Sequence, residues 1–110
     1  MREILAEKIR KVYESNGLIN QIDQTIEEAS ELILALSKYK RFCTNPNSLS
    51  EEYDVAMNIE NICEELADVQ CMIWQMSIPF EDDLREQRIE AKLDRILERL
   101  EKADNERNTF

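Results

Sequence analysis

Acidic residues are the side chains of this sequence whose number and spacing suit catalysis. The 110-residue chain contains 24 Asp and Glu residues and no His, which excludes His-based triads and zinc sites that use His. It contains a single Gly, which excludes the glycine-rich loops that bind nucleotide phosphates. A catalytic Cys is not expected, because no His is present to activate a thiol. Any chemistry of this chain therefore depends on carboxylates.

Pairs of acidic residues spaced three apart occur six times, so this spacing alone identifies no site. The surroundings of each pair follow from placing residues at about 100° per step around a helix. Glu98 and Glu101 face away from the apolar residues of their helix and are expected to be solvated. Two other pairs share helix faces with apolar or neutral polar residues. These pairs are Glu28 with Glu31, and Glu65 with Asp68.

The second kind of pair needs a compensating partner. Burial of an unpaired carboxylate is costly, and four carboxylates together repel one another. Few basic residues lie near them in sequence on the same faces, Lys38 being the nearest on its helix. A hard divalent cation such as Mg²⁺ is therefore the natural counter-charge. The alternative is a salt-bridge network with Lys or Arg residues from another segment.

The two acidic pairs also lie in motifs that resemble those of a known family. Residues 27–32 read EEASEL and residues 64–69 read EELADV, which gives EExxE followed on the next long helix by ExxD. This combination resembles the MazG-like, all-α nucleoside triphosphate pyrophosphohydrolases, a superfamily that includes the dimeric dUTPases. The resemblance covers this chain from about residue 17 to residue 100. The resemblance implies a site for Mg²⁺, with Mn²⁺ as a substitute, whose ligands are Glu28, Glu31, Glu65 and Asp68. It also implies that Glu27 is a catalytic residue that tunes the site or orients water.

The reaction implied by the resemblance is cleavage of a nucleoside triphosphate between its α and β phosphates, giving a nucleoside monophosphate and pyrophosphate. Metal ions suit this reaction because they neutralise the polyphosphate and acidify bound water. Lys92, Arg95 and Lys38 are the candidates for binding phosphate. The same residues could instead form surface ion pairs or complement a helix dipole. The alternative function is a non-catalytic helical interaction protein whose acidic residues form salt bridges.

Four helices are expected to position these side chains. The apolar spacing predicts a first helix that ends near Ser15-Asn16-Gly17 and a second that runs from about 20 to about 41. A third helix is expected to end near Ser77, before Pro79, and a fourth to begin near residue 81. No internal repeat or linker is recognised. The chain is therefore predicted to be a single all-α domain over residues 1–110, a MazG-like four-helix bundle.

Two segment ends carry more specific expectations. A loop is predicted from Cys43 to Ser48, after which Ser48 or Ser50 is expected to cap the third helix. Glu51 and Glu52 would then lie in its first turn, where the helix dipole favours acidic residues. The polar tail from about residue 104 is expected to fray.

The charge balance and the cysteines limit the partners and the location. The formal net charge is −10, which weighs against nucleic acid and against anionic membranes as partners. No apolar run approaches the length of a membrane span. The three cysteines lack CxxC spacing and are interpreted as reduced, mostly buried thiols of a cytoplasmic protein.

The third helix is apolar on nearly every side and is expected to be covered on several sides. Four helices of this size cover it only partly, so a homodimer or homotetramer is predicted. The stripe Leu93, Ile96 and Leu100 is one candidate contact, the alternative being that it packs inside its own subunit. Trp74 is expected to pack in the core or between subunits, whereas Tyr39 and Tyr53 are candidates to contact a base.

Overall fold

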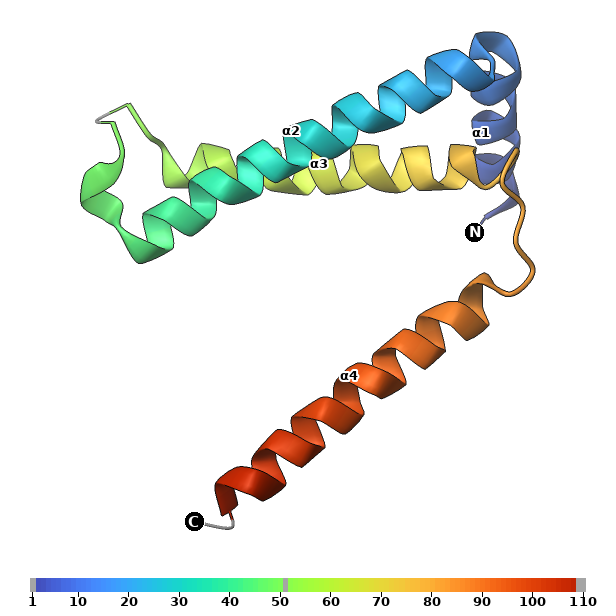
Figure 1. The fold of residues 1–110 in the computed structure, drawn as a ribbon. Coiled ribbons are helices and arrows are strands. Elements are labelled where there is room, and N and C mark those ends of the chain that lie inside the picture. The colour runs from blue at the N-terminus through green and yellow to red at the C-terminus, as the bar shows by residue number, and fades with distance from the viewer. Residues whose placement is uncertain (1, 51, 109–110) are drawn as a thin grey trace. The chain divides into compact units, whose positions relative to one another are not determined.

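A computed structural model describes residues 2–50 and 52–108, and these residues form helices and no strand. The elements in chain order are α1 (Glu3–Asn16), α2 (Leu18–Thr44), the short 3-10 helix η1 (Pro46–Ser48), α3 (Val55–Met76) and α4 (Arg85–Asn108) (Figure 1). The prediction of an all-α chain with four α-helices is confirmed. None of the helices in the described part of the chain is long and apolar enough to cross a membrane.

Contacts between residues divide the chain into two compact units, Met1–Phe80 and Glu81–Phe110. The first unit contains α1, α2, η1 and α3, and the second contains α4. That residues 1–110 act as one domain stays a prediction.

Gly17 forms the turn between α1 and α2. Among the described residues it alone has a positive φ, 84°. Its N–H donates to the carbonyl of Tyr13 at 2.8 Å and ends α1, while its own carbonyl accepts from the N–H of Gln21 at 3.1 Å. An L side chain is strained at this φ although no atom lies within 4 Å of the Cβ position. The predicted stop at residues 15–17 is confirmed.

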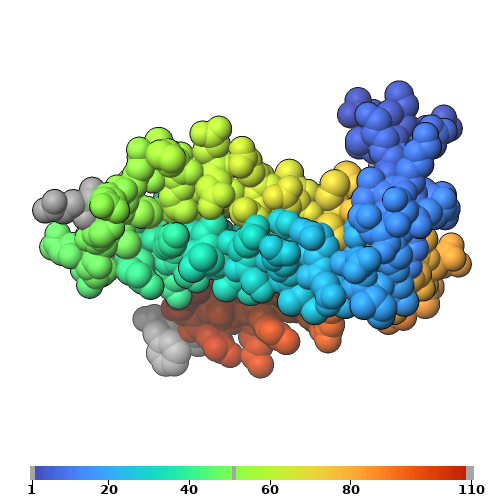
Figure 2. All heavy atoms as spheres, turned by 90° about the horizontal axis from the view of Figure 1, so that it is seen from above, coloured from blue at the N-terminus to red at the C-terminus, as the bar shows by residue number. Residues whose placement is uncertain are grey.

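α2 and α3 lie side by side and antiparallel, and they form the main contact of the first unit (Figures 1 and 2). Gln21 near the start of α2 donates from its side-chain amide to Gln75 near the end of α3. Near the other end, the amide of Asn58 donates to the carbonyl of Ala35 at 3.3 Å. All four of these residues are buried. The two amide contacts therefore fix how α2 and α3 are aligned along their length.

α3 begins later than predicted, because Asp54 and not Ser48 or Ser50 is its N-cap. The Asp54 carboxylate accepts the N–H of Met57 at 3.1 Å. The hydroxyl of Ser48 donates instead to the carbonyl of Asn45 at 2.8 Å and so belongs to the turn of η1. Glu52 precedes the helix, and Glu51 lies outside the described residues. The predicted end of α3 near Ser77 is confirmed.

The predicted loop also begins later than expected, because α2 continues to Thr44. The hydroxyl of Thr44 donates to the carbonyl of Lys40 at 2.9 Å, as in a continuing helix. The predicted loop residue Cys43 therefore belongs to the last turn of α2.

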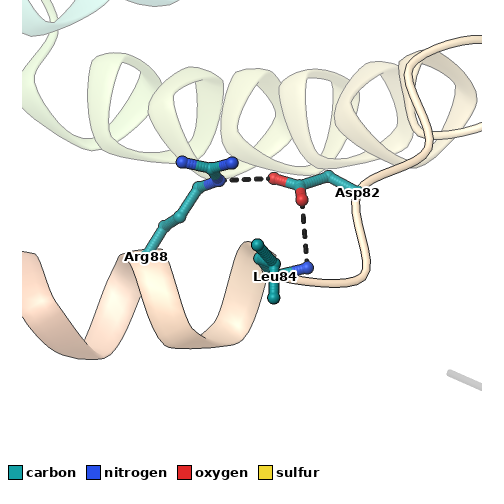
Figure 3. A network of polar contacts seen from close by, with 3 residues as sticks. All are labelled: Asp82, Leu84 and Arg88. Atoms are coloured by element: carbon teal, nitrogen blue, oxygen red, sulfur yellow. Dashed lines mark hydrogen bonds and ion pairs between the residues drawn. The ribbon is translucent and has the colours of Figure 1, made fainter.

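α4 follows a turn built around Asp82. One oxygen of its carboxylate accepts the N–H of Leu84 at 3.0 Å, and the other accepts from Nε of Arg88 at 2.8 Å (Figure 3). The predicted start at residues 81–83 is thus the turn that precedes the helix, which begins at Arg85. The predicted fraying from residue 104 is wrong, because α4 continues to Asn108 and Arg107 pairs with Asp104 at 3.5 Å.

The three cysteines are free and exposed, so the expectation of mostly buried thiols is wrong. Cys63 and Cys71 lie on sides of α3 that are turned away from α2 at about 100° per residue. The polar residues Asn58 and Gln75 occupy the α2–α3 contact in place of these small apolar side chains.

Candidate metal centre

Three of the four predicted metal ligands meet in the middle of the α2–α3 contact. Glu28, Glu31 and Glu65 each offer one carboxylate oxygen, and these oxygens lie within 4.8 Å of one another. Glu28 is seven residues after Gln21, and Glu65 is seven residues after Asn58. Seven residues are close to two helical turns, so both glutamates follow the stripe that each helix turns toward the other.

Burial and like charge act together on Glu28 and Glu65. Both residues are half-buried, and the Oε2 atom of each is shielded from solvent without a hydrogen-bond partner in residues 2–50 and 52–108. Burial raises the pKa of both carboxyl groups above the ordinary value of 4.5, and the neighbouring carboxylates raise it further. The amide of Gln24 donates to Oε1 of Glu28 at 2.7 Å and partly offsets this effect on the Glu28 pKa.

Basic side chains do not compensate these charges. In the described part of the chain, no Lys or Arg is among the groups that shift the pKa of Glu28 or Glu65. A salt-bridge network, the alternative to a cation, therefore has no support around these two residues. Two carboxylate oxygens are shielded from solvent and accept no hydrogen bond from the described residues, and further carboxylates lie beside them. Oxygen ligands of this kind are the ones that a hard divalent cation prefers.

Asp68 and Glu27 lie at the margin of the cluster. The carboxylate of Asp68 is near enough to raise the pKa of both Glu28 and Glu65, yet it is not among the three residues whose oxygens lie within 4.8 Å. Glu27 is exposed and precedes Glu28, about 100° around α2. Its side chain is not part of the converging group.

The first unit also has a cavity of about 850 Å³, whose lining does not include Glu28, Glu31, Glu65 or Asp68. It lies between the end of α2, the segment around η1 and the start of α3. Asn61 and Glu64 in its wall are within about one turn of Glu65, and Lys38 is two turns beyond Glu31. The cavity and the cluster are therefore separate features of the α2–α3 pair, linked by neighbouring residues along each helix.

The wall of this cavity combines basic, aromatic and amide groups with four acidic residues, Glu52, Asp54, Glu60 and Glu64. Lys38 and Arg41 supply positive charge from α2. The hydroxyl of Tyr53 donates to the side-chain carbonyl of Asn58 at 2.5 Å, and burial raises the pKa of this tyrosine. The Tyr53 ring also packs at 5.7 Å from the ring of Phe42. Tyr53, a predicted base contact, thus lines the cavity, whereas Tyr39 packs against Phe42 at 6.3 Å.

The three predicted phosphate ligands lie in different units. Lys38 lines the cavity of the first unit, while Lys92 and Arg95 lie on α4 in the second. Lys38 therefore belongs to the same unit as the carboxylates, and Lys92 and Arg95 do not. Arg41, a second wall residue with a guanidinium group, lies three residues after Lys38, a spacing that places both on one side of a helix.

Asn58 is the site residue whose role the sequence indicated least. Asn58 shares its helix face with Glu65 and Asp68, as the helical spacing indicates. Its contacts with the carbonyl of Ala35 and the hydroxyl of Tyr53 were not predicted. A buried amide with both ends bonded anchors the cavity wall to α2. These partners come from segments far apart in sequence, so spacing along one helix carries no signal for them.

No protein-family model matches this chain, and no curated protein or solved structure gives a significant match. The resemblance to the MazG-like enzymes therefore rests on the two acidic motifs.

Proposed function

We propose that this protein is a metal-dependent nucleoside triphosphate pyrophosphohydrolase, as its resemblance to the MazG-like enzymes implies. The observation that supports this proposal most directly is the convergence of Glu28, Glu31 and Glu65, two of which hold a shielded oxygen without a donor. Mg²⁺, or Mn²⁺ in its place, takes carboxylate oxygens of this kind as ligands. Asp68, beside the three, is proposed as the fourth ligand.

The proposed reaction adds water to the α phosphorus and breaks its bond to the oxygen that bridges the α and β phosphates. The products are a nucleoside monophosphate and pyrophosphate. When bound, the metal supplies charge neutralisation and a more acidic water. Glu27, exposed beside Glu28, is proposed to accept the proton of the attacking water or to orient it.

The cavity supports a role for basic residues in binding the substrate. Lys38 and Arg41 in its wall are suited to bind phosphate oxygens, the guanidinium by two parallel N–H donors. Tyr53 offers an aromatic face in the same wall for the nucleoside. Lys92 and Arg95 of α4 are proposed as further phosphate ligands.

The proposal includes a cytoplasmic, homo-oligomeric enzyme. Three free cysteines are typical of a reducing compartment, which supports the cytoplasmic location. The many exposed apolar side chains on α2 and α3 support self-association, since monomers rarely expose large apolar patches.

The test is release of pyrophosphate by the purified full chain from a panel of ribo- and deoxyribonucleoside triphosphates that includes dUTP. We expect pyrophosphate and a monophosphate with Mg²⁺ or Mn²⁺ and neither with EDTA. Glu65→Gln should lower kcat/KM at least about 100-fold, because a neutral amide binds a divalent cation poorly. Glu98→Gln on α4, an equally conservative change of an exposed acid, is the matched control and should leave kcat/KM unchanged.

Two results would contradict the proposal. Orthophosphate with a nucleoside diphosphate would place the cleavage at the β–γ bond. No turnover, together with no rise in melting temperature on addition of Mg²⁺, would favour the non-catalytic helical interaction protein.

A further inference from the structure

Asn58 is a buried residue that joins three segments of the first unit. It lies in the first turn of α3, and its side-chain amide donates to the main-chain carbonyl of Ala35 in α2 at 3.3 Å. Its side-chain carbonyl accepts from the hydroxyl of Tyr53, which precedes α3, at 2.5 Å. Asn58 is 8% exposed and Ala35 is 2% exposed, so water has little access to the bond between them.

The neighbours of Asn58 fix the orientation of its amide. A main-chain carbonyl can only accept a hydrogen bond, so the nitrogen end of the amide must face Ala35. The oxygen end is then left for the hydroxyl of Tyr53, which donates to it. The ring of Tyr53 is held in turn by packing at 5.7 Å from the ring of Phe42 in α2. The Asn58 amide therefore has one orientation in which both of its ends are bonded.

The contact with Ala35 holds the main chain of α2 and not one of its side chains. Inside an α-helix each carbonyl accepts the N–H four residues later, and its second lone pair remains available. The Asn58 amide donates to that position of Ala35. Two flexible side chains can keep a contact by rotation when helices slide, whereas a fixed amide on a main-chain carbonyl cannot. Sliding of α2 along α3 would therefore break this bond.

This bond lies close to the carboxylate cluster on both helices. In α2, Ala35 follows Glu31 by one turn, about 6 Å along the axis. In α3, Asn58 precedes Glu65 by two turns, about 10 Å along the axis. Glu31 and Glu65 come from different helices, yet they offer oxygens that lie within 4.8 Å of each other. How these two carboxylates are placed along the helix axes thus depends on the bond between Asn58 and Ala35.

The cluster by itself opposes this placement. Burial, together with repulsion between the carboxylates, raises the pKa of Glu28 and of Glu65. Contacts beside the cluster must resist the force that separates the charges. The amide contact of Gln21 with Gln75, two turns before Glu28, joins two side chains. The bond of Asn58 reaches the main chain, so it limits sliding more strictly.

Fixed ligands matter more for Mg²⁺ than for Ca²⁺. Mg²⁺ requires a near-ideal octahedron of oxygens at about 2.0–2.1 Å, whereas Ca²⁺ accepts about 6–8 oxygens at about 2.3–2.6 Å in flexible arrangements. Carboxylates on two helices that slide freely can still surround Ca²⁺, but they lose the geometry that Mg²⁺ needs. A site between two helices therefore favours Mg²⁺ only if the helices are held in register.

We propose that Asn58 is a positioning residue of the cation site, and that its bond to Ala35 makes this site selective for Mg²⁺ over Ca²⁺. The inference rests on the proposed function, because it requires that Glu28, Glu31 and Glu65 hold the cation. Asn58 itself does not contact the metal. It acts through the main chain of α2, and Tyr53 acts by orienting the Asn58 amide.

The test measures ion affinity on the full chain without nucleotide. Mn²⁺ is bound first, and its displacement by Mg²⁺ or by Ca²⁺ is followed by electron paramagnetic resonance. Asn58→Leu keeps the size of the side chain and removes both hydrogen bonds. We expect it to lower the affinity for Mg²⁺ at least about 10-fold and the affinity for Ca²⁺ less than about 3-fold. Asn61→Leu, the same exchange at an exposed position nearer to Glu65, is the matched control and should change both affinities less than about 3-fold.

Tyr53→Phe covers the case in which Asn58→Leu does not fold, which circular dichroism checks. It keeps the ring and removes only the hydroxyl that orients Asn58, so the ratio of Mg²⁺ to Ca²⁺ affinity should fall at least about 3-fold.

The ratio separates positioning from stability. A residue that only stabilises the fold would leave the ratio of the two affinities of the folded protein unchanged. An unchanged ratio in Asn58→Leu and Tyr53→Phe would therefore overturn the proposal, and so would an equal loss of selectivity in Asn61→Leu. In both cases the wild type still binds metal, and the proposed function stands. A wild type that binds no Mn²⁺ would instead contradict the metal site of the proposed function, and this inference with it.

Discussion

Glu28 and Glu65 hold their carboxylates where ionisation is opposed by burial and by their neighbours. The groups that face them from α2 and α3 are Glu31 and Asp68, and only the Gln24 amide acts in the opposite direction on Glu28. The amide contacts at both ends of the helix pair prevent α2 from sliding to separate the charges. The carboxylates of the cluster therefore repel one another electrostatically, and a bound cation would reduce this repulsion.

This repulsion predicts how stability depends on pH without metal. The pKa of each carboxyl group is raised above 4.5 in the folded protein, so the folded state holds more protons than the unfolded state above this pH. The contribution of these two groups to stability should then fall as pH rises from about 4.5 toward neutrality. We expect thermal melts in EDTA to show this fall, and Mg²⁺ to reduce it.

The control for this prediction is Glu65→Gln, which removes one titrating group and one charge from the cluster. Its melting temperature in EDTA should exceed that of the wild type at pH 7 and depend less on pH. A pH profile as steep as that of the wild type would show that the cluster is not the origin of the effect.

Residue types and helical angles singled out Glu28, Glu31, Glu65 and Asp68, of which the first three converge. Glu28 and Glu65 share faces with residues that prove to be buried, such as Ala35 and Asn58, and local periodicity is enough to recognise such a face. Cys63 and Cys71 were misplaced because a small apolar side chain is equally compatible with a core and with an exposed face. Which of the two applies depends on the neighbouring helix, and the sequence of one helix does not contain that information.

At the scale of the element, the turn before α4 depends on one side chain. The Asp82 carboxylate accepts the N–H of Leu84 and pairs with Arg88, and both contacts lower the pKa of Asp82. A lowered pKa means that the stabilising contribution is present above the ordinary value of 3.8 and is lost as pH falls through the folded-state pKa.

Asp82→Ala should therefore loosen the first turn of α4. Because the variant lacks the acceptor for the Leu84 N–H and the partner of Arg88, we expect the amides of residues 84–88 to exchange with solvent at least about 3-fold faster at neutral pH. Hydrogen exchange followed by NMR measures this rate. Asp83→Ala, an adjacent and exposed acid, is the matched control and should leave the rates unchanged.

Helix ends were predictable where one residue decides them locally. Gly17 and Pro79 act through their own backbone geometry, and the ends of α1 and α3 follow them. The start of α3 was not predictable, because Ser48, Ser50 and Asp54 are all good caps. In the structure the Ser48 hydroxyl donates to the carbonyl of Asn45 in the turn of η1, and the Asp54 carboxylate accepts the N–H of Met57.

At the scale of the whole molecule, the cluster and the cavity both belong to Met1–Phe80. The cavity could not be predicted from the sequence, because its walls come from α2, η1 and α3 together. Its position follows from the alignment that the Gln21–Gln75 and Asn58–Ala35 contacts impose, and such pairing across 54 and 23 residues leaves no local pattern.

A chain that ends at Phe80 should therefore keep its response to metal. We expect Mg²⁺ to raise its melting temperature about as much as that of the full chain. Turnover should fall at least about 10-fold, because Lys92 and Arg95 are missing and each charged contact to phosphate contributes on the order of 1.5–3 kcal/mol. Full activity of this fragment would exclude both residues as phosphate ligands, and loss of the Mg²⁺ effect would show that the cluster needs residues beyond 80.

α2 and α3 carry the glutamates Glu28 and Glu65 on one side and the exposed apolar side chains Ile26, Ile33 and Leu66 on another. This separation has a consequence for how such a protein changes over generations. Glu28 and Glu65 occupy other positions of the seven-residue helical period than Ile26, Ile33 and Leu66. A substitution at either glutamate therefore leaves these apolar side chains unchanged. Mutations that abolish or redirect the chemistry can therefore accumulate while the Ile-rich surface is retained, and the reverse holds as well. Selection can act on each side separately, so descendants that keep one property and lose the other are accessible by single substitutions.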